Sequence, residues 1–258
     1  MLSEFVDAGE GTRMPQLTVV IPARNEAGRI GRAVRTVHEV LEQAQIGHEI
    51  VVVDDASSDE TRSEAADLCR NFPLRVLSHA QPLGKGAAIA TGFSASTGDQ
   101  CAFIDADLEF PPALLVRMLR TVESGLAPQQ TCAVGVRQAD ERSRLERLTS
   151  RLARGVIHYV AHLPVRDTQA GIKMFPGWFA RDISTQLTEP GWLFDVEALL
   201  LARRRHLEIL PFPLRQLRLR PRRASASDYL RSAAILVRLV ARSRANLEIA
   251  ASRESPPA

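Results

Sequence analysis

Cysteine is scarce in this 258-residue chain, and its placement excludes two kinds of site. Cys69, Cys101 and Cys132 are odd in number and more than thirty positions apart, which fits neither a disulfide framework nor a zinc-binding cysteine set. A free cysteine packs as a small hydrophobic residue. We therefore expect three reduced cysteines in the core.

Long apolar runs are also missing. The uncharged stretches are strand-sized, whereas a membrane-spanning helix needs about 20 consecutive apolar residues. The acidic N-terminus, with Glu4, Asp7 and Glu10, lacks the basic-then-apolar order of a signal peptide. We expect the protein to be made and kept in the cytosol.

Lysine is almost absent, because 31 of the 33 basic residues are arginine. The two lysines, Lys85 and Lys173, both fall in motifs described below, which indicates positions that favour an ammonium point charge over a guanidinium fork. The net charge is only +3, yet 13 arginines and four acidic residues follow from Arg203 to the end. This basic tail favours a phosphate-bearing partner such as a membrane surface or a lipid phosphate, unless it is only a solvated face. It carries no RNA-binding motif or aromatic platform, so we expect no nucleic-acid partner.

Apolar, β-branched runs alternate with segments of helical period, which predicts an α/β fold with a mostly parallel, Rossmann-like sheet covered on both faces. The helix after the first run is indicated by a stripe of Ile30, Val34, Val37 and Leu41. Ser57, with a glutamate three residues later, predicts a capping box for the next helix. The predicted strands are 17–23, 48–56, 74–80, 100–109 and 131–137.

One catalytic domain over 15–223 is expected, between flexible ends at 1–14 and 249–258. Segment 224–248 is predicted to form a basic amphipathic helix, with arginines on one side and an apolar arc on the other. That arc either enters an anionic membrane surface or packs on the catalytic domain. The arginines are Arg231, Arg238 and Arg242, and the arc holds Tyr229, Ala233, Leu236, Val237 and Val240.

Acidic and special residues follow three of the predicted strands directly, at 22–26, 54–55 and 105–109. In an open α/β sheet, ligands bind outside the carboxyl ends of the strands, so these groups should meet in one site. The chain has no G-x-G-x-x-G after the first strand and no Walker loop around Lys85.

Asp105 and Asp107 end a buried strand two residues apart. Their carboxylates, together with the diphosphate of a nucleotide sugar, would suit Mg²⁺ or Mn²⁺, which prefer oxygen ligands. Such a metal would neutralise the departing nucleoside diphosphate. A pair of aspartates in a surface turn is the alternative.

The other strand-end groups have two interpretations each. Asn25, Glu26, Asp54 and Asp55 either cap helices or accept hydrogen bonds from the base and ribose of a nucleotide. Lys85 either lies in a solvated turn or helps a helix N-terminus to hold an anion.

Seven ordered motifs give the chain a specific resemblance to family 2 glycosyltransferases, over about residues 17–220. Within that family the chain resembles the dolichyl-phosphate and polyprenyl-phosphate mannose and glucose synthases, which implies a GT-A fold. The motifs are VVIPARNE (19–26), VVVDDASSDET (51–61), GKGAAIATG (84–92), FIDADLEFPP (103–112), GVR (135–137), LPVRDTQAGIKMF (163–175) and WLFDVEALL (192–200).

The resemblance implies a role for each matched residue. Pro22, Asn25 and Glu26 would line the nucleotide pocket, and Asp55 would contact the nucleoside. Asp105 and Asp107 would hold the diphosphate and the metal, with Glu109, which is Gln in many mannose synthases, as a further ligand. The residues that would face the sugar and phosphates are Arg137, Asp167, Gln169, Gly171 and Lys173. Asp195 would lie close to the reacting centre.

The implied reaction is inverting transfer of a hexose, from GDP-mannose or UDP-glucose, to a polyprenyl phosphate. A phosphate monoester is already largely dianionic near neutral pH, because its second pKa is about 6, so this acceptor needs no general base. Arg137 would position the acceptor, and Lys173 would stabilise the leaving group. A soluble acceptor with a hydroxyl nucleophile is the alternative, and it would need a carboxylate base, for which Asp195 is the best candidate.

Overall fold

The computed structural model describes residues 15–137, 165, 168, 170–214, 235, 238, 239 and 241. The predicted flexible ends at 1–14 and 249–258 lie outside these residues, so the predicted domain bounds stay predictions.

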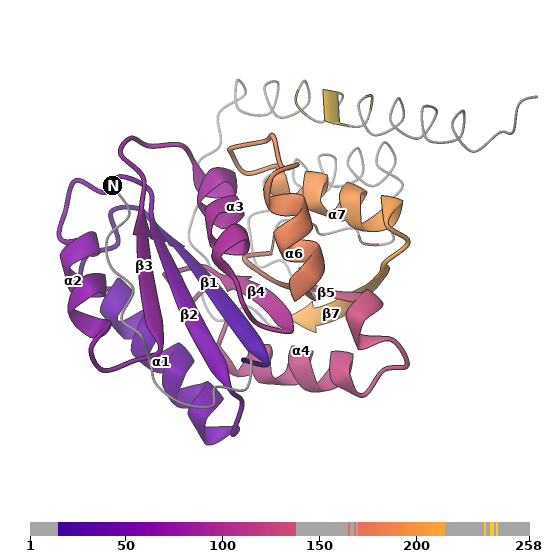
Figure 1. Ribbon diagram of the computed structural model, residues 1–258, viewed down its shortest axis with the longest axis horizontal. Helices are drawn as coiled ribbons and strands as arrows, with labels where there is room; N and C mark the ends of the chain where they lie inside the picture. The colour runs from indigo at the N-terminus through magenta and orange to yellow at the C-terminus, as the bar shows by residue number, and fades with distance from the viewer. Residues whose placement is uncertain are drawn as a thin grey trace, which may run out of the picture.

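The described strands form one seven-stranded sheet in the order β3-β2-β1-β4-β6-β5-β7 (Figure 1). Only β6 runs against the other strands, so the predicted mostly parallel α/β sheet is confirmed. The strands are β1 (Leu17–Ala23), β2 (His48–Asp54), β3 (Leu74–Ser78), β4 (Gln100–Ile104), β5 (Thr131–Arg137), β6 (Ile172–Pro176) and β7 (Glu208–Leu214).

Helices cover both faces of the sheet (Figure 1). One core cluster joins the sheet to α1 (Ile30–Gln43), α2 (Thr61–Leu68) and α4 (Ala113–Glu123). The other joins it to α3 (Lys85–Ala95), α6 (Gly177–Ser184) and α7 (Phe194–Arg204), while a short 3-10 turn, η1 (Pro128–Gln130), precedes β5. The stripe predicted for the first helix is buried in α1, and Cys101 and Cys132 are buried as expected, whereas Cys69 is exposed.

The predicted capping box is wrong. Helix α2 begins at Thr61 with Glu60 as its N-cap and no side-chain cap. The Oγ of Ser57 instead accepts a hydrogen bond from the backbone N–H of Asn25 at 2.9 Å. This serine therefore joins the loops after β1 and β2, which lie side by side because their strands are paired.

Strands β6 and β7 were not predicted from the sequence. Every residue of β6 is buried, including Lys173, whose charge interrupts the apolar pattern of this strand. Strand β7 contains Pro211 and Pro213, which are tolerated because it lies at the edge of the sheet and pairs only with β5. Because β6 is antiparallel to β4, its first residues lie beside the carboxyl end of β4.

The four described residues of the predicted C-terminal helix agree only partly with its expected surface role. Ile235, Arg238, Leu239 and Ala241 are helical, and Leu239 is buried in the core cluster that contains α7, with Ile235 packed against it. Arg238 and Ala241 are exposed. The residues of the predicted apolar arc lie outside the described residues, but the helix does pack on the domain at these two positions.

Among the described residues, no helix combines the length and the apolar character that crossing a membrane requires.

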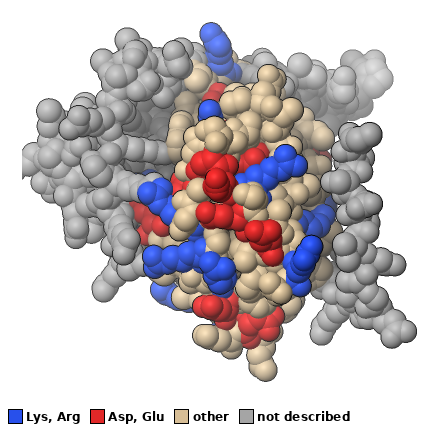
Figure 2. All heavy atoms as spheres, turned by 90° about the vertical axis from the view of Figure 1, so that its left-hand side faces the viewer, with Lys and Arg blue, Asp and Glu red and all other residues tan. Residues whose placement is uncertain are grey.

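The face beside β3 and α2 shows acidic side chains gathered near its middle with basic side chains around them (Figure 2).

Candidate active site

The loops that follow β1 and β2 are tied together by backbone and side-chain hydrogen bonds. Asn25 Oδ1 accepts from the N–H of Ser58 at 2.9 Å, and Glu26 N–H donates to Thr61 Oγ1 at 2.7 Å. The carboxylate of Glu26 forms an ion pair with Arg29, and Asp54 Oδ1 accepts weakly, at 3.3 Å, from the N–H of Ser57. None of these side chains caps a helix, because the N-caps of α1 and α2 are Arg29 and Glu60 and neither helix has a side-chain cap.

Three loops at this edge of the sheet contain a non-glycine residue in the left-handed region. Asn25, Ala56 and Leu108 have φ of 53°, 53° and 51° and follow β1, β2 and β4. Side chains disfavour this conformation, and residues held in it cluster at functional sites. The strained backbone and the predicted site therefore share one edge.

The carboxylate of Asp55 holds the segment that leads into α3. Its Oδ1 accepts from His79 Nδ1 at 2.8 Å and from the N–H of Leu83 at 2.7 Å, and its Oδ2 accepts from the N–H of Gly84 at 2.8 Å. Burial alone raises the pKa of Asp55, but these hydrogen bonds outweigh burial and hold it below its usual range. Both carboxylate oxygens are engaged within the chain, and the predicted nucleoside contact stays a prediction.

The N-terminus of α3 bridges the loop after β2 and the start of α7. Gly84 has φ +101°, and a Cβ there would lie 2.4 Å from the carbonyl oxygen of Pro190, so only glycine fits. The N–H of Gly86 donates to the same oxygen at 2.8 Å. Lys85, the first residue of α3, places its Nζ 2.5 Å from Asp105 Oδ1.

Asp105 lies just beyond β4, against Gly171, the residue that precedes β6. A Cβ on Gly171 would come within 2.2 Å of Asp105 Oδ2, so this glycine lets the carboxylate lie against the backbone. The N–H of Asp105 donates to the carbonyl of Gly171 at 3.2 Å. Two residues further on, Asp107 Oδ1 accepts from the N–H of Glu109, and both of these side chains are half-buried.

A second lysine–aspartate pair lies in the interior next to this edge. Lys173 Nζ is 2.8 Å from Asp195 Oδ1 and also donates to the carbonyl of Ala170 at 2.8 Å. The exposed fraction is 0% for the Lys173 side chain and 7% for that of Asp195. Burial raises the pKa of Asp195, and the ammonium groups of Lys173 and Lys85 oppose part of that rise.

The ring of Phe103 lies between the two lysine–aspartate pairs. Lys85 Nζ is 5.7 Å and Lys173 Nζ 5.2 Å from its centroid, both within cation–π range. Lys85 also lies 5.1 Å from the ring centroid of Trp192, a residue that is 54% exposed. The only two lysines of the chain therefore lie beside the same aromatic ring, and each pairs with its own aspartate.

The structure brings most of the predicted site residues to one edge of the sheet. Pro22 is half-buried near the end of β1, and Arg137 is half-buried at the end of β5, which runs in the same direction as β4. Asp167 and Gln169 lie outside the described residues. The predicted residues gathered in the loops, in α3, or beside β4 and β6 are Asn25, Glu26, Asp54, Asp55, Lys85, Asp105, Asp107, Glu109, Gly171, Lys173 and Asp195.

Sequence reasoning did not identify three residues that shape this site: His79, Phe103 and Trp192. His79 links Asp55 to Thr91 of α3 through its two ring nitrogens, at 2.8 and 3.0 Å. His79 follows β3 directly, and this position at a strand end could have identified it as a candidate site residue. The apolar residues Phe103 and Trp192 gave no such signal, because their contacts with lysine depend on the packing of distant segments.

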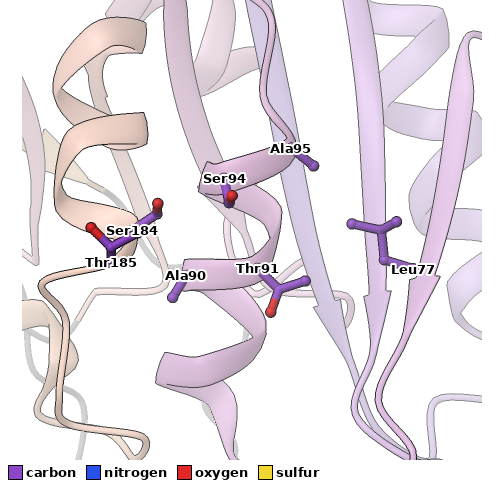
Figure 3. Close-up of a pocket in the computed structure, with 7 residues that line it drawn as sticks. All are labelled: Leu77, Ala90, Thr91, Ser94, Ala95, Ser184 and Thr185. Carbon is purple, nitrogen blue, oxygen red and sulfur yellow. The ribbon is translucent and has the colours of Figure 1, made fainter. Parts of the chain in front are cut away.

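A separate hollow lies along α3 and beside the end of α6 (Figure 3). None of the predicted site residues and no charged group lines it. The lining residues are Leu77, Ala90, Thr91, Ser94, Ala95, Ser184 and Thr185. The polar, charged edge of the sheet is therefore the better candidate for phosphate chemistry.

The carboxylates of Asp105 and Asp107 suit a hard divalent cation. Both are oxygen donors, both remain partly accessible, and Asp105 already has a cation, the ammonium of Lys85, against one oxygen. Mg²⁺ is usually held in this way, by one or two carboxylates together with substrate phosphates. The residues thus fit the predicted metal.

Residues 18–181 match the sequence profile described as Glycosyl transferase family 2, which covers more than half of the chain. A dolichyl-phosphate beta-glucosyltransferase of Saccharomyces cerevisiae is 31% identical over 219 residues, 77% of this chain and 66% of that protein. The glycosyltransferase AglD of Haloferax volcanii is 29% identical over 206 residues, 77% of this chain and 32% of that protein. The chain thus spans about one third to two thirds of the length of these relatives.

Solved structures of glucosyl-3-phosphoglycerate synthase from Mycobacterium tuberculosis share the fold. One, determined with Mn²⁺, UDP-glucose and phosphoglyceric acid, superposes with a TM-score of 0.63 at 20% identity, covering 88% of this chain and 80% of that chain. Another of these structures contains Mg²⁺ and UDP, with a TM-score of 0.57 at 21% identity, covering 80% of this chain and 73% of that chain. The predicted GT-A fold is confirmed by this similarity.

The Lys173–Asp195 pair predicts a specific pattern of stability. Lys173→Met should lower the free energy of unfolding by about 3–5 kcal/mol, because it leaves the carboxylate of Asp195 buried without its partner. Adding Asp195→Asn should recover most of that loss, since the uncompensated charge is then gone. Lys85→Met, at a partly exposed lysine, should cost less. Urea unfolding measures all four proteins, and a double variant no more stable than Lys173→Met would contradict the interpretation.

Proposed function

Because the chain belongs to glycosyl transferase family 2, we propose that it transfers a hexose from a nucleotide sugar to a polyprenyl (dolichyl-type) phosphate, with inversion at the anomeric carbon. The observation that carries this proposal is the edge at which Asp105, Asp107 and Lys85 meet. Relatives named dolichyl-phosphate beta-glucosyltransferase and dolichol-phosphate mannosyltransferase support the acceptor class.

The donor would place its diphosphate against Asp105 and Asp107, with its nucleoside toward the loops after β1 and β2. A bound Mg²⁺ or Mn²⁺ would neutralise charge on the departing diphosphate. Structures of the same fold that contain UDP-glucose with Mn²⁺ or UDP with Mg²⁺ support this assignment. UDP-glucose and GDP-mannose are the two donors to be compared.

The two lysines would have different roles. Lys173 is fully buried, so its ammonium would hold Asp195 and lie beside the Phe103 ring, while its expected contact with the leaving group stays a prediction. Lys85 is 15% exposed and reaches Asp105, so it would be the lysine that meets the diphosphate. Both would supply positive charge already oriented before the donor binds.

The acceptor phosphate would attack the anomeric carbon opposite the diphosphate, with Arg137 positioning its oxygens. A phosphate dianion needs no proton removed, so catalysis would rest on orientation and electrostatics. The burial of Asp195 and its pairing with Lys173 favour this account, since a base for a hydroxyl acceptor must reach the acceptor proton.

The acceptor class is tested by incubating the purified chain with a polyprenyl phosphate, Mg²⁺ or Mn²⁺, and radiolabelled UDP-glucose or GDP-mannose. We expect label from one donor to enter the organic phase, because the product carries the lipid. Label that stays in the aqueous phase as a glycosylated small acid, when such an acceptor is supplied, would favour the soluble-acceptor alternative. No transfer to either acceptor would contradict the proposed function.

Asp107→Asn should reduce transfer by at least about 10³-fold, because it removes a carboxylate expected to hold the metal that neutralises the departing diphosphate. Asp107 lies at the rim and contributes no core packing, so the circular dichroism spectrum should not change. Chelation should stop the wild-type reaction, and added Mn²⁺ should restore it. Transfer by the variant within tenfold of wild type would refute the metal assignment.

Asp195→Asn distinguishes the two nucleophiles through the pH dependence of kcat. With a phosphate nucleophile, kcat should rise with pH up to a plateau as the acceptor loses its second proton, with a pKa of about 6, in both proteins. With a hydroxyl nucleophile and Asp195 as base, the variant should lose about 10²-fold or more, and the limb set by the base should vanish. The first outcome is expected, together with a modest loss of rate.

The basic C-terminal helix is further proposed to bring the enzyme to the inner face of the cell membrane. Changing Arg231, Arg238 and Arg242 to glutamine should reduce co-sedimentation with anionic vesicles at low salt, since each basic residue near such a surface contributes up to about 1 kcal/mol. This change keeps the buried Leu239 in place. Equal sedimentation of the variant and wild type would show that the helix serves only to cover the domain.

A further inference from the structure

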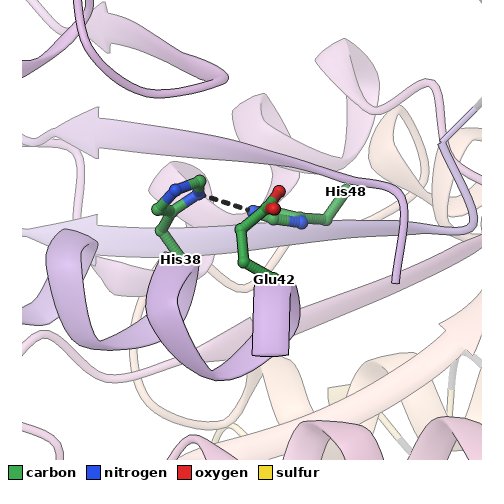
Figure 4. A group of neighbouring side chains, drawn as sticks. All are labelled: His38, Glu42 and His48. Carbon is green, nitrogen blue, oxygen red and sulfur yellow. Dashed lines mark hydrogen bonds between the residues drawn. The ribbon is translucent and has the colours of Figure 1, made fainter. Parts of the chain in front are cut away.

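A cluster of three metal-ligating side chains lies away from the proposed active site. His38 and Glu42 are on α1, one turn apart, and His48 is the first residue of β2 (Figure 4). One ligand atom from each lies within 4.8 Å of the others, and no other such group occurs in the parts of the chain that the structure describes. The proposed mechanism uses none of these residues.

We propose that His38, Glu42 and His48 form a second divalent-metal site, suited to Zn²⁺, that fixes the C-terminal half of α1 to the start of β2. Two imidazoles and a carboxylate are ligands that Zn²⁺ accepts, whereas Mg²⁺ prefers a set made only of oxygens. Three protein ligands leave the fourth position to water, and Glu42 is exposed, so water can reach it.

The distance between the two imidazoles is near that of a zinc-bound pair. His38 Nδ1 lies 3.1 Å from His48 Nε2. Two nitrogens at tetrahedral angles, each about 2.05 Å from zinc, are about 3.3 Å apart. Small movements of two side chains would therefore admit the ion, and Figure 4 shows the Glu42 carboxylate beside the ring of His48.

Contacts outside the ligand set already orient the rings. His48 Nδ1 lies 2.8 Å from the carbonyl oxygen of Ile46, which can only accept, so this nitrogen carries the proton and Nε2 presents its lone pair. Histidine ligands of metals are commonly held by such a contact through the other ring nitrogen. The edge of His38 packs against Phe72, with ring centroids 4.9 Å apart. Burial lowers the pKa of His48, which favours the neutral, metal-binding ring.

Without metal, the same geometry makes a hydrogen bond in which His38 Nδ1–H donates to His48 Nε2. Metal binding would require the proton of His38 to reside on its Nε2, leaving both facing nitrogens free to bind the ion, so the exchange is a change of tautomer with no net proton release. The first and last residues of β2 are about 20 Å apart at the usual rise per residue, so this site is separate from Asp54 and the donor edge.

Zinc binding to protein without a polyhistidine tag, in excess Mg²⁺ to occupy the donor edge, tests the proposal. Equilibrium dialysis should give one Zn²⁺ per chain, and a hundredfold excess over Kd should raise Tm by about 5 °C or more. Glu42→Gln and His38→Gln should each weaken zinc binding by more than about tenfold. Replacing even a residue that only hydrogen-bonds to a metal ligand commonly lowers metal affinity by that much.

Glu39→Gln is the matched control, because Glu39 is exposed on the same helix but lies outside the cluster. It should bind zinc as wild type does. Co²⁺ should give the visible absorption bands of a tetrahedral site in wild type and lose them in Glu42→Gln, a readout that does not depend on folding stability. Saturable binding equal in all four proteins, or no saturable zinc binding by wild type, would overturn the proposal.

Discussion

The buried ion pair between Lys173 and Asp195 constrains the rest of the site. Taking both charges out of water is costly, so the pair persists only if its geometry is held firmly from several sides. Strand β6 supplies the lysine, α7 supplies the aspartate near its positive N-terminal end, and Phe103 of β4 lies beside the ammonium. Strand β6 runs antiparallel to β4, which brings Gly171 against Asp105.

The start of α3 connects the buried pair to the residues at the edge of the sheet. Gly84 donates to Asp55, Lys85 pairs with Asp105, and Gly86 donates to the segment before α7. The loops after β2 and β4 and the start of α7 are therefore fixed by one helix turn. Electrostatic catalysis requires such preorganisation, because charges already in place need no reorganisation when the diphosphate leaves.

Much of the fold was predictable from the sequence because parallel strands and amphipathic helices have strong periodic patterns. Strands β1 and β5 and the buried stripe of α1 occur where the patterns place them. Strand β6 was missed because its single charge, Lys173, is neutralised by a residue 22 positions later, which no local pattern reveals. The strand-end aspartates were identified from position alone, whereas the partners of Asp55 and the ring shared by the lysines depend on tertiary packing.

The location of a bound metal tests the central claim most directly. A crystal of the chain grown with UDP and Mn²⁺ should give one strong manganese anomalous peak beside Asp105 and Asp107, with the uracil toward the loops after β1 and β2. These positions would confirm that the strand ends form the donor site and that Lys85 faces the diphosphate. A nucleotide bound in the hollow between α3 and α6, or a manganese peak remote from both aspartates, would contradict the account.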